Sequence, residues 1–206
     1  MIRVWGRRNS INVQKVMWTI AELGLDHERI DAGGAFGKLD TPEYGRRNPN
    51  RKIPVIEDGA VVVWESNAIV RYLAAAYGSG GLWPERAAVR AEADRWMDWQ
   101  LTELSPLMHP IFWGLVRTPA ERRDMAAITE AAKAIGPVWR ILEDHLAERR
   151  FVGGDSLTMG DIPVGCAYWR YRNLEVAKPP LPHLEAWFTR LAERPGYREH
   201  VMLPLS

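Results

Sequence analysis

One short stretch, residues 51–69, limits most strongly what this chain can fold into. It holds two runs of β-branched residues around Asp58-Gly59, and an Asp-Gly pair in that setting is a strong signal for a β-hairpin. Pro54 cannot donate a ladder hydrogen bond, so it is expected to begin its strand or to lie at an edge, and a tight turn there would suit a cis bond. After Trp64 the pattern changes from strand to helix. Ser66 can accept from the free N–H groups at the start of that helix, which is therefore a candidate anion site.

The residues before this stretch complete a small α/β unit. Residues 2–5 alternate between polar and apolar side chains as a strand does. Residues 13–23 place apolar side chains at helical spacing, Gly24 ends that pattern, and residues 27–31 are expected to form a second strand. A loop with one short irregular helix follows, and the hairpin leads into a helix from Ser66 to Tyr77. The predicted order, β-α-β-α-β-β-α, matches a thioredoxin-like domain.

Ile53-Pro54, the hairpin and Glu65-Ser66 together resemble the glutathione-binding half of cytosolic glutathione S-transferases. In that family the proline is cis, and the residue before it pairs through its backbone with the cysteinyl part of glutathione. The Glu-Ser pair holds the γ-glutamyl end. The resemblance therefore implies that Ile53, Pro54, Glu65 and Ser66 bind glutathione. Arg51 and Lys52 adjoin the proline turn, and we expect them to pair with the glycyl carboxylate.

The rest of the chain shows no strand pattern. We predict a thioredoxin-like glutathione-binding domain over residues 1–78, a glycine-rich linker over residues 79–87, and an all-α domain over residues 88–206. A long helical pattern opens the second domain, and Pro106 and Pro110 should bend or split it. The next helix is expected to begin at Pro119 and to run to about Arg149.

A local signature later in the chain supports the same family. Thr158 and Asp161 have the spacing of a capping box, and Leu157 and Ile162 have the spacing of a hydrophobic staple. The same signature stands at this point in glutathione S-transferases. Because it lies outside the first domain, it supports the resemblance independently.

The totals of the chain limit its partners. Its 206 residues carry 27 basic and 26 acidic side chains, a net charge of +1, so nucleic acid is not indicated as a partner. A single cysteine excludes an intramolecular disulfide and favours a reducing compartment. No apolar run approaches the roughly 20 residues of a membrane span, and the first residues lack the features of a signal peptide. We therefore expect a cytoplasmic protein that binds neither membrane nor nucleic acid.

Ser10 and Asn12 are the candidates for holding a glutathione thiolate. Lowering a thiol pKa of about 8.5 by two units requires roughly 2.7 kcal/mol, which one or two charge-assisted hydrogen bonds supply without a metal or a general base. Serine-type glutathione S-transferases place their hydroxyl where Ser10 stands. A related bacterial and fungal group reads Thr-Pro-Asn-Gly with a later lysine; Asn12 and Lys15 match it, whereas Ile11 and Val13 do not. A plain helix cap would also explain Ser10 or Asn12, and we place Ser10 modestly ahead as the thiolate donor.

Other reactive or aromatic residues have simpler explanations. Cys166 lies in an apolar helical pattern and is expected to be a buried, inert thiol. The five histidines have no metal-ligand spacing, so no metal site is predicted. Phe112 and Trp113 are candidates for an electrophile pocket or for the core. Trp96 and Trp99 are candidates for a dimer surface or for the core, and the ten tryptophans as a whole indicate either an aromatic core or an apolar ligand site.

The resemblance implies a cytosolic glutathione S-transferase that uses glutathione as co-substrate and attacks small apolar electrophiles in detoxification. A glutathione-dependent isomerase or peroxidase, and a non-catalytic ligand-binding protein of the same fold, remain alternatives. The family also implies a homodimer, in which Asp98 is a candidate to reach the partner's glutathione.

Overall fold

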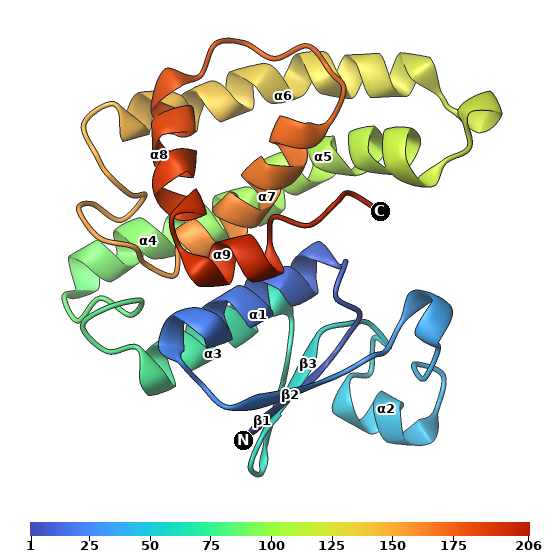
Figure 1. Ribbon diagram of the computed structural model, residues 1–206, viewed down its shortest axis with the longest axis vertical. Helices are drawn as coiled ribbons and strands as arrows, with labels where there is room; N and C mark the ends of the chain where they lie inside the picture. The colour runs from blue at the N-terminus through green and yellow to red at the C-terminus, as the bar shows by residue number, and fades with distance from the viewer.

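A four-stranded mixed sheet forms the first part of the computed structural model, which describes residues 1–206. The strand order is β2-β1-β3-β4, with β1 (Ile2–Trp5) parallel to β2 (His27–Ile30). β3 (Val55–Asp58) is antiparallel to β1 and forms the predicted hairpin with β4 (Val61–Trp64). Figure 1 shows this sheet domain below the helical domain.

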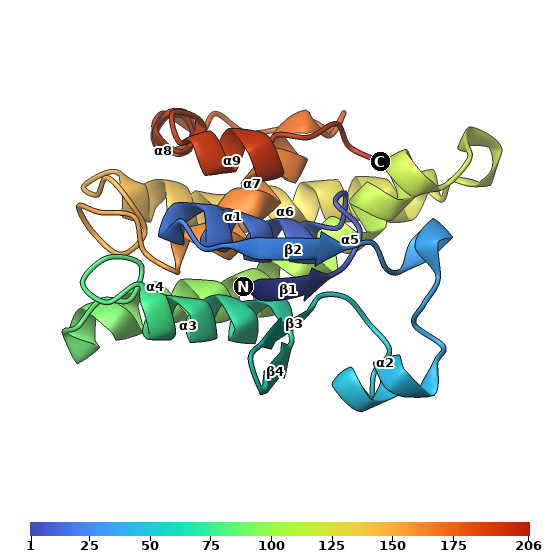
Figure 2. The same cartoon turned by 60° about the horizontal axis from the view of Figure 1, so that its bottom comes forward.

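Helices cover both faces of the sheet: α1 (Ile11–Leu23), α2 (Pro42–Arg47) and α3 (Ser66–Tyr77). Because side chains alternate along a strand, Val4 and Ile56 are buried on the face covered by α1 and α3. Trp5 and Val55 point to the opposite face, where Tyr44 of α2 packs. Figure 2 shows α2 well apart from α1 and α3. The element order confirms the predicted thioredoxin-like domain.

The second part of the chain is helical, as predicted. Its helices are α4 (Ala87–Trp99), α5 (Ser105–Phe112), α6 (Met125–Leu146), α7 (Asp161–Asn173), α8 (Pro182–Ala192) and α9 (Pro195–His200). The long pattern that opens this part is divided by π-helical turns at Gln100–Leu104 and Trp113–Arg117. Pro106 lies in the first turn of α5 and Pro110 lies inside it, and each removes one backbone donor. The helical pattern is therefore interrupted near these two prolines, as the sequence predicted.

Two local features differ from the sequence prediction. α6 begins at Met125 and not at Pro119, because Asp124 caps it by accepting from the N–H of Ala127, 3.0 Å away. The capping box before α7 is only half formed: the N–H of Thr158 donates to the Asp161 carboxylate, but the Thr158 hydroxyl donates to that carboxylate as well. The two side chains therefore do not cap each other reciprocally.

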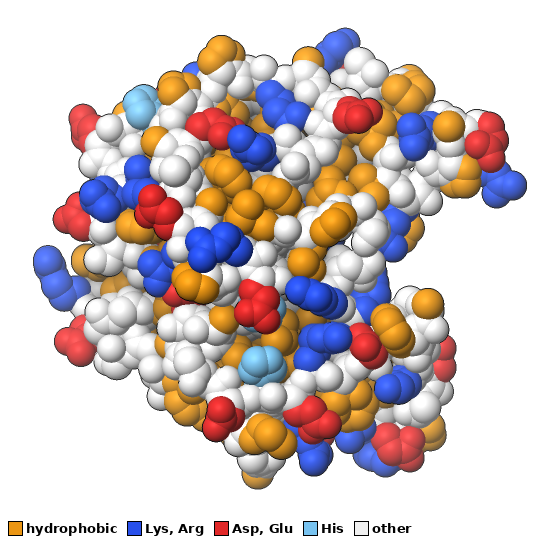
Figure 3. Space-filling model, viewed as in Figure 1, with side chains coloured by type: hydrophobic (Ala, Val, Ile, Leu, Met, Phe, Trp, Pro, Cys, Tyr) orange, Lys and Arg blue, Asp and Glu red, His pale blue; other side chains and the backbone are white.

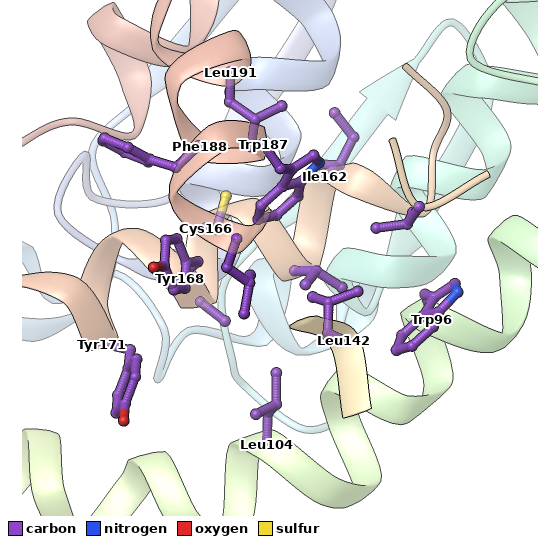
Figure 4. Close-up of a cluster of buried hydrophobic side chains, with 14 of the residues drawn as sticks. Trp96, Leu104, Leu142, Ile162, Cys166, Tyr168, Tyr171, Trp187, Phe188 and Leu191 are labelled. Carbon is purple, nitrogen blue, oxygen red and sulfur yellow. The ribbon is translucent and has the colours of Figure 1, made fainter. Parts of the chain in front are cut away.

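Aromatic side chains fill the core of the helical domain, as Figure 4 shows around Tyr168, Tyr171 and Trp187. Trp139 is fully buried and packs against Tyr168 and Tyr171, with ring centroids 5.2 Å and 5.3 Å away. Trp18 of α1 enters the same core from the sheet domain. An aromatic core therefore accounts for the most deeply buried tryptophans. No helix combines the length and the apolar character that crossing a membrane requires.

Candidate active site

The loop after β1 turns sharply into α1 and presents Ser10 and Asn12. A Cβ atom on Gly6 would lie 2.4 Å from Cγ2 of Val13, so only glycine allows this close approach. Ser10 occupies the N-cap position of α1, but its side chain makes no capping hydrogen bond. The residue is nevertheless almost fully buried. Helix capping therefore does not account for the Ser10 hydroxyl, which remains available to another partner.

Asn12 is tied to the start of α3. Its Oδ1 accepts a hydrogen bond from Oγ of Ser66 at 3.2 Å. This bond fixes the amide plane and leaves the amide NH₂ of Asn12, which has no partner in the chain, free to donate. The structure thus brings together two residues that the sequence selected separately.

The remaining predicted glutathione residues meet at one end of the hairpin. Ile53-Pro54 is cis, as the resemblance implies. Val55 pairs with Trp64, so Pro54 and Glu65 leave the hairpin side by side. The N–H and carbonyl of Ile53 make no hydrogen bond within the chain, which leaves both groups open to a ligand's backbone.

Glu65 has an unusual backbone conformation just before α3. Its φ of +69° lies in a region that non-glycine residues rarely adopt, and such positions concentrate at functional sites. The Glu65 side chain is exposed and has no ion-pair partner in the chain. Next to it, Ser66 begins the helix, whose first N–H groups have no intrahelical partner. This end of α3 therefore combines free N–H donors, which can bind the carboxylate of an α-amino acid, with a free carboxylate, which can bind its ammonium group.

Arg51 and Lys52 are placed differently from each other. Nη1 of Arg51 donates to the carbonyl oxygens of Leu39 and Thr41, at 3.1 Å and 3.4 Å, so its guanidinium braces the α2 segment. The Lys52 side chain is exposed and makes no hydrogen bond. Its carbonyl accepts from Tyr44 and Asn48, which holds the turn before Pro54. Of these two residues, Lys52 is therefore the one whose charged group has no partner in the chain.

Lys15 lies almost fully buried behind this site and links the two domains. Its Nζ donates to Oε1 of Gln100 at 2.8 Å and to Oδ1 of Asn67 at 3.1 Å, and it lies 3.5 Å from Oγ of Ser66. Burial lowers the pKa of Lys15 to about 8, so the ammonium still carries its charge at neutral pH. No carboxylate pairs with it. The buried positive charge of Lys15 therefore contacts Ser66, and Ser66 in turn is hydrogen-bonded to Asn12.

A cavity of about 290 Å³ opens beside Asn12, between α1 and the helical domain. Phe112 and Trp113 both line it; Phe112 also belongs to the buried core of the helical domain, whereas Trp113 is exposed. Arg170 of α7 closes another side, with its guanidinium carbon 3.9 Å from the centroid of the Phe112 ring. The cavity thus offers an aromatic wall and a cation to a small molecule that reaches Asn12.

Known proteins share both halves of this architecture. The family model described as glutathione S-transferase, N-terminal domain, matches residues 1–75, and the corresponding C-terminal domain model matches residues 104–195. Glutathione S-transferase GstB of Escherichia coli K12 is 43% identical over 208 residues, with 100% of both chains covered. The chain belongs to the glutathione S-transferase family.

Solved structures and more distant members of the family agree. The crystal structure of the theta class glutathione S-transferase from Xanthomonas axonopodis pv. citri with glutathione bound is 45% identical and superposes with a TM-score of 0.96, covering 100% of this chain and 99% of that one. Glutathione S-transferase 3 of Zea mays is 29% identical, over 97% of this chain and 93% of its own.

Three residues of the site were not selected from the sequence. Asn67 and Gln100 share the buried Lys15, and Arg170 lines the cavity, but each comes from a helical stretch with no local signature. Lys15 itself was noticed only through its match to the Asn-containing family pattern. Cys166 is buried as expected, and burial raises its thiol pKa to about 12, which keeps it protonated. Within the family, this chain therefore offers no cysteine nucleophile at the site.

Proposed function

We propose that this protein is a glutathione S-transferase that ionises the thiol of glutathione and directs it at an electrophile in the cavity beside Asn12. The observation that carries the proposal is the junction of Asn12, Ser66 and Lys15 at the start of α3, next to the unpaired backbone groups of Ile53. This junction provides donors for a peptide and an electrostatic bias toward an anion. Family membership supplies glutathione as the co-substrate.

Glutathione is proposed to lie along the end of the hairpin. Its γ-glutamyl end meets Glu65 and Ser66, its cysteinyl backbone pairs with Ile53 beside Pro54, and its glycyl carboxylate is directed at Lys52. Arg51 assists only if its guanidinium leaves the carbonyl oxygens of Leu39 and Thr41. The sulfur then points toward the N-terminus of α1, where Ser10 and Asn12 offer donors and the helix dipole favours negative charge.

The thiolate attacks the electrophilic carbon of the second substrate. A carbon–sulfur bond forms, the bond to the leaving group breaks, and the leaving group departs with its electron pair. Holding both substrates in one site supplies much of the acceleration. The reaction needs only a stabilised thiolate and therefore requires neither a metal nor a redox group.

Turnover of 1-chloro-2,4-dinitrobenzene with glutathione tests this function. We expect catalysis above the uncatalysed rate, and we expect Ser66→Ala to weaken glutathione binding by about tenfold, because one hydrogen bond to a charged group is worth about 1.5 kcal/mol or more. Calorimetric titration measures the affinity, and Ser156→Ala, which changes an exposed serine outside the site, is the control. Equal affinities for the two variants would remove Ser66 from the site.

We also propose a homodimer. Val61, Val62 and Trp64 of the edge strand β4 and Tyr77 of α3 expose apolar surface, and an isologous dimer would bury this surface on both subunits. Trp96 is buried against His145 inside the subunit, so the core and not the dimer surface is the one of its two sequence interpretations that applies.

Light scattering at micromolar concentration tests the dimer. We expect twice the subunit mass for the wild type and a monomer for Val62→Glu, whereas Met125→Glu, at an exposed apolar position elsewhere, should stay dimeric. A wild-type monomer would refute the pairing. Asp98 accepts from Arg71 of its own subunit, so its proposed reach to the partner's glutathione requires that ion pair to open.

We also propose a domain division into residues 1–78, 79–87 and 88–206. We further propose a role in detoxification and a cytoplasmic location. The single cysteine supports a reducing compartment, and the family resemblance supports the other two points.

A further inference from the structure

Arg170 lies in the wall of the cavity, and its positive charge has no partner in the chain. It is half-buried in α7, stacks on Phe112, and makes no hydrogen bond or ion pair with any residue of the chain. Two other arginines near the domain boundary do have partners: Arg194 pairs with Glu22, and Arg71 pairs with Asp94. A guanidinium has five donors in a rigid fork, so Arg170 presents unused donors to whatever fills the cavity.

Two more arginines reinforce this charge. Burial is the main cause that lowers the pKa of Arg170 to about 10, and the charges of Arg117 and Arg7 act in the same direction. Neither Arg7 nor Arg117 has an Asp or Glu partner; Nη2 of Arg117 donates to the main-chain oxygen of Ser206, whereas its Nε is buried without an acceptor. Figure 3 shows Lys and Arg side chains bordering the hollow between the two domains. The three arginines thus form a positive cluster that no Asp or Glu side chain pairs with, and an anion would stabilise it.

We propose that the cavity selects electrophiles that carry an anionic group, a carboxylate, a sulfonate or a phosphate, and that Arg170 binds this group while the reacting carbon faces the thiolate near Asn12. The inference rests on the proposed transferase function and narrows its substrate class. Asn12 and Arg170 line the same cavity of about 290 Å³, so a single aromatic ring can meet both. Phe112 and Trp113 provide the aromatic wall for that ring.

Arg170 acts here on binding and not on the bond changes. With a chloronitrobenzoate, the thiolate sulfur attacks the ring carbon that bears chlorine, and the electron pair moves into the nitroaryl ring. The carbon–chlorine bond then breaks and chloride leaves with that pair. The thiol proton goes to solvent, and no oxidant or reductant takes part. The carboxylate stays intact on Arg170 throughout.

The test compares two substrates of nearly equal shape, 4-chloro-3-nitrobenzoate and 4-chloro-3-nitrobenzamide. For each, kcat/KM is divided by the uncatalysed rate with glutathione. We expect the wild type to prefer the benzoate, and we expect Arg170→Gln to lower that preference by about ten- to a hundredfold, because a hydrogen bond between charged groups is lost. The change should lie in KM for the benzoate. Arg170→Lys should restore part of the preference.

Controls separate this inference from the transferase function. Arg140→Gln removes one positive charge from an exposed site on α6 that makes no hydrogen bond, and it should leave the preference unchanged. If the wild type turns over neither substrate, the transferase function fails. If it turns over the benzamide and shows no preference for the benzoate, or if Arg170→Gln lowers both equally, only the anion site is refuted. An increase in KM for glutathione alone would assign Arg170 to glutathione instead.

A second measurement does not depend on the stability of the Arg170 variant. In the wild type, unreactive 3-nitrobenzoate should inhibit competitively against the benzamide substrate and not against glutathione, and 3-nitrobenzamide should inhibit at least tenfold more weakly. Equal inhibition by the two compounds would overturn the proposal.

Discussion

Ser10 and Asn12 differ in what their side chains already bind. The Asn12 amide is oriented by Ser66 and lines the cavity, whereas the Ser10 hydroxyl has no partner and does not line it. An oriented donor loses less conformational freedom when it binds a thiolate. The geometry therefore favours Asn12 as the stronger donor, the reverse of the order that the sequence suggested.

We expect Asn12→Ala to raise the thiol pKa of bound glutathione by one unit or more, which corresponds to about 1.4 kcal/mol per unit. Ser10→Ala should raise it less. The measurement is the thiolate absorbance of the enzyme–glutathione complex as a function of pH. A larger shift for Ser10→Ala would restore the order suggested by the sequence. No shift in either variant would assign the sulfur to backbone N–H groups and the helix dipole.

Helix α7 depends on Asp161 at its first residue. The buried carboxylate accepts from the N–H groups of Val152 and Thr158, from the Thr158 hydroxyl and from Nε1 of Trp187. These four bonds fix the start of the helix against the preceding loop and α8. Because Arg170 lies in α7, the same bonds also position the cavity wall.

Asp161→Asn should lower the free energy of unfolding by about 3 kcal/mol, because one acceptor becomes an NH₂ group that faces buried donors. Urea denaturation followed by tryptophan fluorescence measures this change. Asp155→Asn, at an exposed position in the preceding loop, should change stability by less than about 0.5 kcal/mol. A similar, small effect of both changes would show that the network does not anchor α7.

The two domains share a buried polar contact at Lys15, in addition to the ion pairs Arg71–Asp94 and Arg194–Glu22 at their boundary. Lys15 of α1 reaches Gln100 of the π-helical turn after α4, and Gln100 in turn donates to Ser105. Trp18, one turn further along α1, packs against Tyr197 of α9, with ring centroids 4.7 Å apart. The helix that carries the proposed thiolate donors is therefore held by the helical domain as well as by the sheet.

Stability should depend on pH through Lys15. Its pKa is lowered from 10.5 to about 8 in the folded protein, so the unfolded chain binds more protons between these values. The free energy of unfolding should therefore rise with pH through this interval, by about 3 kcal/mol for a fully buried group, and should be independent of this group below about pH 8.

The measurement is urea denaturation from pH 7 to pH 10, with Lys15→Met as the reference. The difference in unfolding free energy between wild type and Lys15→Met should grow in favour of the wild type as the pH rises. A constant difference would show that Lys15 does not change its protonation on folding in this range.

The sequence determined the hairpin, the element order of the first domain and the positions of Ser10, Asn12, Pro54 and Ser66, because each depends on neighbours within a few residues. Alternation, helical spacing and turn residues are local signals, and they were enough to indicate the family. The proline breaks near α5 were predictable for the same reason. The late start of α6 was not predicted, because Pro119 in the same polar stretch also suits the first turn of a helix, whereas the cap that forms is Asp124.

Only the tertiary structure decided which distant residues share the site. Asn12 and Ser66, 54 positions apart, meet because α1 packs against α3 within the first domain. Lys15 meets Gln100, 85 positions away, and Asn12 shares a cavity with Arg170, because the two domains pack against each other. It also decided that Trp96 lies inside the subunit and that the Arg51 guanidinium binds its own chain. Helical periodicity says which side of a helix is apolar but not what that side meets, so the charge in the cavity wall became visible only after folding.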